Sequence, residues 1–170
     1  VRAKAYWNEK MLHDEIRYHN PDYSGSGQFQ IENGKLLRAV LAGSSITSLE
    51  CFRGMALEGL DLSGNPVSDL APLAGQPLGL LYIEDTMVED LTPLRGVPLV
   101  SLYAARAPIH LLAGLEGAPL EELNVIATRV ADLSPVTDAP LKMVWLTGCP
   151  VTDISPIAKA PLVSLTLHKT

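Results

Sequence analysis

Four aspartates recur at a fixed interval along the chain, and repeated carboxylates are groups that could bind cations. They are Asp69, Asp90, Asp132 and Asp153, separated by 21 residues or by twice 21. A calcium site needs several oxygens converging on one point, whereas a single file of carboxylates offers one group per repeat. An aspartate just before a helical turn can instead accept hydrogen bonds from the free N–H groups of that turn. The sequence therefore favours a capping role, with a ladder of metal sites as the less favoured alternative.

Other residues capable of chemistry are scattered along the chain. The histidines stand at 13, 19, 110 and 168, and none has a second ligand at metal-binding spacing. No phosphate-binding loop, nucleophile elbow, C-x-x-C pair or kinase catalytic motif is present. The sequence therefore predicts a non-catalytic protein that holds no metal and no cofactor.

Composition and charge narrow the possible partners. Residues 1–35 hold five basic and five acidic side chains, so residues 36–170 carry all of the net charge of -6. The net negative charge disfavours nucleic acid as a partner, because phosphate binding needs a basic surface. No apolar run approaches the length of about 20 residues that spans a membrane. Cys51 and Cys149 are the only cysteines, and we expect both to be reduced; together with the lack of a signal peptide in this sequence, this favours a cytoplasmic location.

The sequence pattern has a period of 21 residues, and the structural elements that it predicts must position any functional site. A leucine column reads Leu36, Leu57, Leu78, Leu99, Leu120, Leu141 and Leu162. Alternating apolar residues from Leu57 to Leu62 predict a short strand with one buried face, and the motif Asp-Leu-x-Pro-Leu predicts a short helical turn after it. One such unit cannot bury its apolar face alone, so the units must stack.

The repeated pattern L-x-x-L-x-L-x-x-N/T/C-x-V-x-D-L-x-P-L resembles the leucine-rich repeat family. It is most similar to bacterial repeats, including those linked to Ser/Thr protein kinases and those of internalin-like surface proteins. The resemblance implies an α/β solenoid with a parallel β-sheet on the concave side and short helical or 3-10 turns on the convex side. We expect residues 1–35 to form a cap and residues 36–170 to form the repeats. Their bounds are 36–56, 57–77, 78–98, 99–119, 120–140, 141–161 and a partial 162–170.

Two columns of the repeat carry further expectations. The asparagine position of the pattern reads Ser44, Asn65, Thr86, Ala107, Thr128, Cys149 and Thr170. These side chains are expected to hydrogen-bond the backbone of the turn inside the stack. Residues 107–114 break the aspartate column, with Leu111 in its place and Gly114 where proline is usual. This predicts an irregular turn that packs an extra leucine, or else presents Leu111 to a partner.

The two ends of the solenoid differ. Residues 4–18 predict an amphipathic helix with Trp7, Met11, Leu12 and Ile16 near one face, followed by a hairpin around Asn33-Gly34. These segments would cap the first repeat. The last strand carries Leu165 and Leu167 and has no comparable cover in this sequence. We therefore expect either that the natural chain continues or that copies associate end to end through this strand.

The residues between the structural leucines of each strand should point outward on the sheet, in three columns. The first column reads Arg38, Gly59, Leu80, Ser101, Glu122, Met143 and Ser164. The second reads Val40, Asp61, Tyr82, Tyr103, Asn124, Trp145 and Thr166. The third reads Ala42, Ser63, Glu84, Ala105, Ile126, Thr147 and His168. Three of the nine aromatic residues fall in one column and are candidate hot spots for binding. The predicted partner-binding set is Tyr82, Tyr103, Trp145, Leu80, Met143, Ile126, Asp61 and Asn124. An alternative is that Tyr82 and Tyr103 only stack as neighbours on adjacent strands.

The favoured function is a non-catalytic module that binds a protein partner, of unknown identity, on its concave sheet. The alternative is a structural or regulatory repeat segment of a larger bacterial signalling protein such as a Ser/Thr protein kinase.

Overall fold

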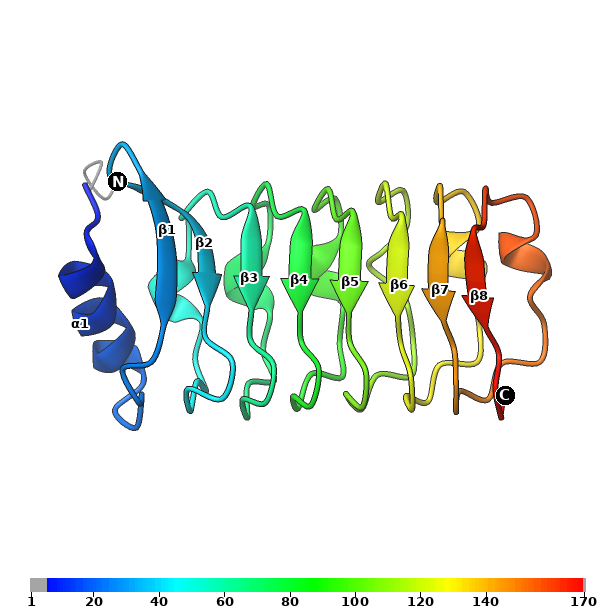
Figure 1. Ribbon diagram of the computed structural model, residues 1–170, viewed down its shortest axis with the longest axis horizontal. Coiled ribbons are helices and arrows are strands. Elements are labelled where there is room, and N and C mark those ends of the chain that lie inside the picture. The colour runs from blue at the N-terminus through cyan, green and yellow to red at the C-terminus, as the bar shows by residue number, and fades with distance from the viewer. Residues whose placement is uncertain (1–5, 170) are drawn as a thin grey trace.

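The chain forms a leucine-rich repeat solenoid, seen in a computed structural model that describes residues 6–169 (Figure 1). A helix, α1 (Glu9–His19), precedes a sheet of eight strands whose spatial order is their order in the chain. The strands are β1 (Gln28–Glu32), β2 (Lys35–Val40), β3 (Gly59–Asp61), β4 (Leu80–Tyr82), β5 (Ser101–Tyr103), β6 (Glu122–Asn124), β7 (Met143–Trp145) and β8 (Ser164–Thr166). Within residues 6–169, no helix has the length and apolar character that crossing a membrane requires.

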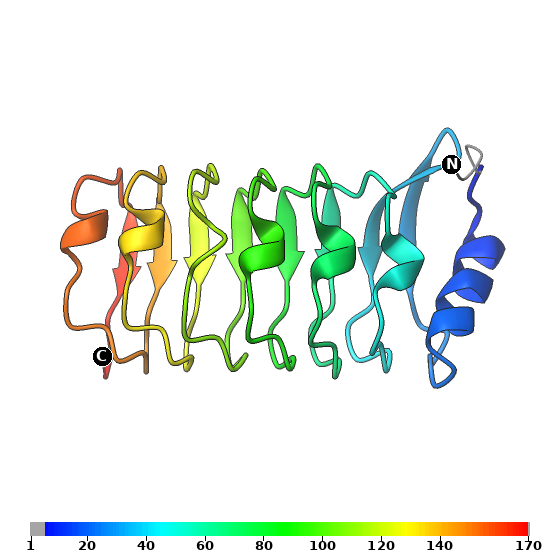
Figure 2. The ribbon, with the colours of Figure 1, turned by 180° about the vertical axis from the view of Figure 1, so that it is seen from behind.

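Short 3-10 turns form the opposite side of the solenoid (Figure 2). They are η1 (Glu50–Phe52), η2 (Ala71–Leu73), η3 (Thr92–Leu94), η4 (Ser134–Val136) and η5 (Ser155–Ile157). The predicted division into a sheet side and a turn side is confirmed.

Strands β2 to β8 pair in parallel with a constant register. Gly59 lies opposite Leu80, and Leu80 lies opposite Ser101, so each residue meets the one 21 positions further on. Strands β3 to β8 have three residues each rather than the predicted six, whereas β2 has six. Hydrogen bonds continue beyond β3, from Leu62 N to Tyr82 O and from Gly64 N to Glu84 O, but the chain there already bends into the next turn.

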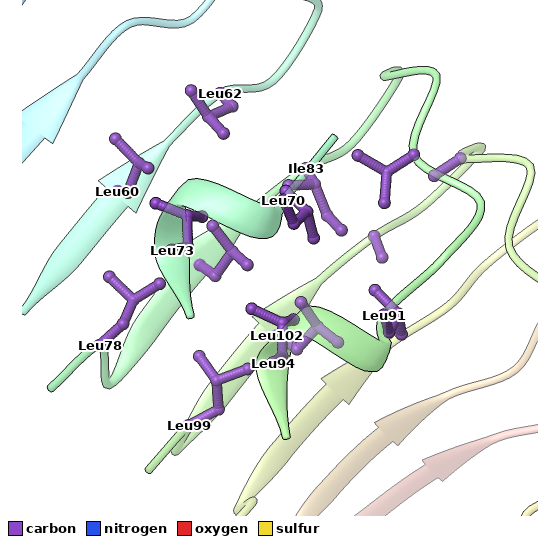
Figure 3. Packing of buried hydrophobic residues seen from close by; sticks show 14 of the residues in the cluster. Leu60, Leu62, Leu70, Leu73, Leu78, Ile83, Leu91, Leu94, Leu99 and Leu102 are labelled. Carbon is purple, nitrogen blue, oxygen red and sulfur yellow. The ribbon is translucent and has the colours of Figure 1, made fainter. Parts of the chain in front are cut away.

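The core lies between the sheet and the turns and is almost entirely aliphatic. Figure 3 shows Leu70 and Leu73 of one repeat and Leu91 and Leu94 of the next at equivalent places, all directed inward. These four side chains are at most 1% exposed. Burial of one leucine contributes about 1.5–3 kcal/mol, so the repeated columns stabilise the stack without any disulfide; Cys51 and Cys149 are free and buried, as expected.

Polar side chains inside the stack form hydrogen bonds with the backbone of the turns, as predicted for the asparagine position of the repeat. Asn65 Oδ1 accepts hydrogen bonds from Ser44 N (2.9 Å) and Ile46 N (2.8 Å) of the preceding repeat. Its Nδ2 donates to Leu41 O and Leu62 O at 2.7 and 2.8 Å. The hydroxyls of Thr86 and Thr128 and the thiol of Cys149 each donate to one carbonyl. Thr170, the last residue of this column, lies outside the described residues.

The aspartate column caps the 3-10 turns. In each case Oδ1 accepts from the backbone N–H two residues later at 2.8 Å, and these N–H groups belong to Ala71, Thr92, Ser134 and Ser155. These hydrogen bonds lower the pKa values of Asp90, Asp132 and Asp153. Among the described residues, no group of three or more His, Cys, Asp or Glu side chains is placed to hold a metal ion.

The N-terminal cap differs from its prediction in detail. Helix α1 begins at Glu9, with Asn8 as its N-cap, rather than at residue 4; residues 4 and 5 lie outside the described residues. Leu12 and Ile16 are buried, but Met11 is 41% exposed and Trp7, which precedes the helix, is only partly buried. Met11 was wrongly placed on the packing face because it lies about 100° around the helix from Leu12. The hairpin turn at Asn33 (φ 51°) and Gly34 (φ 72°) is confirmed.

The repeat of residues 99–119 has no 3-10 turn, as its broken pattern predicts. Gly114 has φ 106°, and a Cβ at that position would overlap the carbonyl oxygen of Leu91. Only glycine therefore allows this segment to approach the preceding repeat so closely. Leu111 is 54% exposed, which agrees with the version of the prediction that presents it at the surface rather than packing it.

Candidate functional site

An aromatic row, defined as Tyr82, Tyr103 and Trp145, crosses the outer face of the sheet. The ring centroids of Tyr82 and Tyr103 are 4.6 Å apart with an interplanar angle of 13°. The centroids of Tyr103 and Trp145 are 6.1 Å apart at 37°, across the position of Asn124. Tyr82 and Tyr103 are stacked, whereas Trp145 is tilted against Tyr103. All three side chains are half-buried and therefore still meet solvent.

The regular register of the sheet produces this row. Tyr82 and Tyr103 are direct partners in β4 and β5, and parallel strands lie about 4.8 Å apart, which is close to the spacing of stacked rings. Asn124 and Trp145 follow in β6 and β7. The sequence prediction that these residues share a column is confirmed, and so is the stacking of Tyr82 on Tyr103.

Apolar residues flank the aromatic row on both sides. Leu80 and Met143 each stand two residues before an aromatic residue of the same strand, and Ile126 follows β6. All three are half-buried. Asp61 and Asn124 brace the chain where it leaves the strand, since Asp61 Oδ1 accepts from Ser63 N and Asn124 Oδ1 accepts from Ile126 N. The eight predicted residues thus lie on one face, although Ala105, assigned to the same outward columns, is buried.

Carboxylates lie close to the two tyrosines. The Tyr103 hydroxyl donates a hydrogen bond to Glu122 Oε2. Burial raises the pKa of Tyr103, and the hydrogen bond and charge of Glu122 raise that pKa further. The pKa of Tyr82 is also raised, by burial first and then by the charges of Asp61, Glu122 and Glu84.

Glu84 and Glu122 therefore belong to the candidate site by their closeness to the tyrosines, and the predicted set did not include them. The signal was available in the sequence, because Glu122 belongs to the first outward column and Glu84 to the third. Their closeness to the rings depends on side-chain conformation, which the repeat pattern of the sequence does not determine.

Several other residues capable of chemistry lie away from the aromatic row. His13 Nδ1 is 2.9 Å from the Tyr23 hydroxyl within the cap. His110 and Leu111 line a shallow pocket of about 280 Å³ on the turn side, together with Glu89, Asp90, Leu91, Thr92 and Ala113. Burial, with a smaller contribution from Glu15, raises the pKa of the Cys51 thiol to about 12, so this cysteine is a poor nucleophile.

Comparisons with known proteins agree with this fold. No family model and no curated protein sequence matches the chain. An internalin (inlF) from Listeria monocytogenes str. 4b F2365 superposes with a TM-score of 0.60 at 21% sequence identity, covering 90% of this chain. An internalin C2 (inlC2) from the same organism has a TM-score of 0.48 at 18% identity and covers 92% of each chain.

The chain spans 54% of the length of the first of these internalins. At this level of identity the similarity bears on the fold and not on the ligand. The repeats of this chain are thus built like those of an internalin.

Proposed function

We propose that this chain is a protein-interaction module whose binding surface is the sheet face centred on the aromatic row. The main observation is that Tyr82 stacks on Tyr103, that Trp145 lies tilted against Tyr103 from β7, and that each of the three side chains remains partly open to solvent. Tyrosine and tryptophan are enriched in binding hot spots because they bring large apolar area and a polar group with little loss of conformational entropy.

The surroundings of the aromatic row support this role. Leu80, Met143 and Ile126 extend the apolar area on either side, while Asn124 and Asp61 supply polar groups beside it. An apolar centre with polar groups at its margin is the usual composition of a protein interface. The regulatory alternative, a repeat segment beside a catalytic domain such as a kinase, would be supported by such a domain in the adjoining reading frame.

A peptide library displayed on phage tests the proposal without a known partner. Peptides selected on the wild-type protein are synthesised and their affinities are measured against Y82S/Y103S/W145S. We expect a loss of about a hundredfold or more, because hot-spot residues each contribute on the order of 2 kcal/mol. Far-UV circular dichroism and the thermal midpoint establish that the variant is folded.

A matched control removes three exposed apolar side chains from other faces. Met87, Leu111 and Val163 are 59%, 54% and 81% exposed, and the variant M87S/L111S/V163S should bind the selected peptides with unchanged affinity. Peptides that bind the aromatic variant as tightly as the wild type would refute the proposed function.

A further inference from the structure

The charge on the sheet face points to the chemistry of the ligand. Across the five repeats from 57 to 161, the three outward columns hold fifteen residues, of which three are acidic and none is lysine or arginine. The acidic ones are Asp61, Glu84 and Glu122. Within these fifteen positions, the charged side chains beside the aromatic row are therefore all acidic.

These three carboxylates have no ion-pair partner among residues 6–169, whereas nearby acids do. Arg106 donates from Nε and Nη2 to the two carboxylate oxygens of Asp85. Lys142 Nζ lies 2.7 Å from Glu121 Oε2. Both pairs join residues 21 apart in the turns that border the sheet. The basic side chains closest in sequence to the face are thus paired with other acids. The charge of Arg106 also acts on Glu84, but Asp61, Glu84 and Glu122 form no ion pair among the described residues.

Tyr82 offers a defined place for a cation. Its register partners are Tyr103 on one side and Asp61 on the other. Because one ring face lies against Tyr103, the opposite face is turned toward the strand of Asp61. A cationic group at that face would contact both the π-system of Tyr82 and the carboxylate of Asp61.

The nearest lysine or arginine in the same columns is Arg38 in β2. Its side chain lies over Gly59, with atoms 3.2 to 3.6 Å from the place a Cβ would occupy. Arg38 thus lies over Gly59 in β3, one strand before the aromatic row begins.

We infer that the ligand of this face is a protein segment in which lysine or arginine side chains stand beside apolar ones. This inference rests on the proposed function and adds the chemical class of the partner. Apolar side chains of the segment would pack on the aromatic row with Leu80 and Met143, and its cations would meet Asp61, Glu84 and Glu122. Complementary charge gives such an interface its specificity and a fast association rate.

Defined peptides test the inference. Short fluorescein-labelled peptides in which leucine alternates with lysine, glutamate or serine are titrated against the wild-type protein, and binding is followed by fluorescence anisotropy. The lysine peptide should bind most tightly. Its affinity should fall as salt rises from about 0.1 to about 1 M, because the screening length shortens from about 10 to about 3 Å.

Charge-removing variants then test whether the carboxylates of the sheet face bind the lysine peptide. D61N/E84Q/E122Q should bind the lysine peptide about tenfold more weakly, as expected for the loss of three partly exposed charge contacts. The control D22N/E89Q/D138N makes the same change in net charge at exposed positions outside the outward columns and should bind like the wild type. Equal affinities for the three peptides, or equal losses in both variants, would overturn the inference.

The two proposals fail in different ways. Library-selected peptides that need the aromatic row but carry no excess of lysine or arginine would overturn the charge inference and leave the proposed function standing. A lysine peptide that binds Y82S/Y103S/W145S as tightly as the wild type would overturn both proposals.

Discussion

Tyr103 contacts both an aromatic side chain and an acidic side chain of the sheet face. Its ring stacks on Tyr82, and its hydroxyl donates to Glu122, which lies on the next strand. The ring is therefore held in place from two sides before any ligand arrives. Such pre-organisation reduces the entropy that binding must overcome.

Substitution of Glu122 should change the titration of Tyr103. In E122Q we expect the pKa of Tyr103 to fall toward the ordinary value of 10.0 but to stay above it, because burial, the larger cause, remains. The pKa is measured from the phenolate absorbance as the difference between each protein and its Tyr103→Phe counterpart. An unchanged pKa in E122Q would show that Glu122 does not act on this phenol.

The raised pKa also has a consequence for stability with a definite sign. A folded-state pKa above 10.0 favours the protonated phenol in the native protein, so its contribution to the free energy of unfolding is full below pH 10. That contribution is lost as the pH rises through the folded-state pKa. Y103F should therefore lose less stability than the wild type as the pH rises above 10.

At the scale of the element, Asn65 joins two repeats through a side chain rather than through a strand. It bonds the backbone of Ser44 and Ile46, which belong to the preceding turn, and the carbonyl of Leu62 in its own repeat. Asn20 has the same role at the junction with the cap, where its Oδ1 accepts from Thr47 N and Ser48 N. The first turn of the stack is thus secured by an asparagine of the cap.

Asn65→Ala should be among the most destabilising single changes in the chain. It leaves several buried backbone groups without partners, and the expected loss is roughly 2–4 kcal/mol in the free energy of unfolding. Thr86→Ala is the matched control, because it removes a single bond to Ile83 O in the same column and should cost only about 1 kcal/mol. Urea unfolding measures both values, and equal losses would contradict the assignment.

The repeating elements were predictable from the sequence because a fixed period of 21 determines which residues face the core. The strand register, the aspartate caps and the aromatic row all follow from that period, whereas the hairpin turn was predicted from the Asn33-Gly34 pair. Pairing between individual side chains does not. Gln76 occupies a position that is apolar in later repeats, yet it is buried and its Nε2 donates to Phe52 O and Pro72 O. Periodicity did not place Met11 correctly either, because α1 is a single helix without repeats to average over.

At the scale of the whole molecule, each repeat packs mainly on its two neighbours, so a local defect should remain local. The repeat of residues 99–119 tests this property, since it lacks a 3-10 turn and depends on Gly114. The two ends also differ: α1 covers the first repeat, whereas Val163 near β8 is 81% exposed and Leu167 is 37% exposed.

Gly114→Ala should disturb the middle of the solenoid alone. The added methyl group meets the Leu91 carbonyl and the backbone has φ 106°, so we expect a cost of about 2 kcal/mol or more. Hydrogen–deuterium exchange should show lost protection around residues 91–118 and wild-type protection in β1 and β2. Uniform loss of protection along the chain would contradict the expectation that the defect stays local. Gly117→Ala is the control, because a Cβ there meets nothing within 4 Å and the variant therefore measures the cost of the positive φ without a steric overlap.

The most direct test of the sheet face as the recognition surface is a map of NMR chemical-shift changes on binding a library-selected peptide. We expect the largest changes to fall on β4 to β7 and to include Tyr82, Tyr103 and the indole N–H of Trp145. Changes confined to the turn side around Leu111, or to the end at β8, would contradict it.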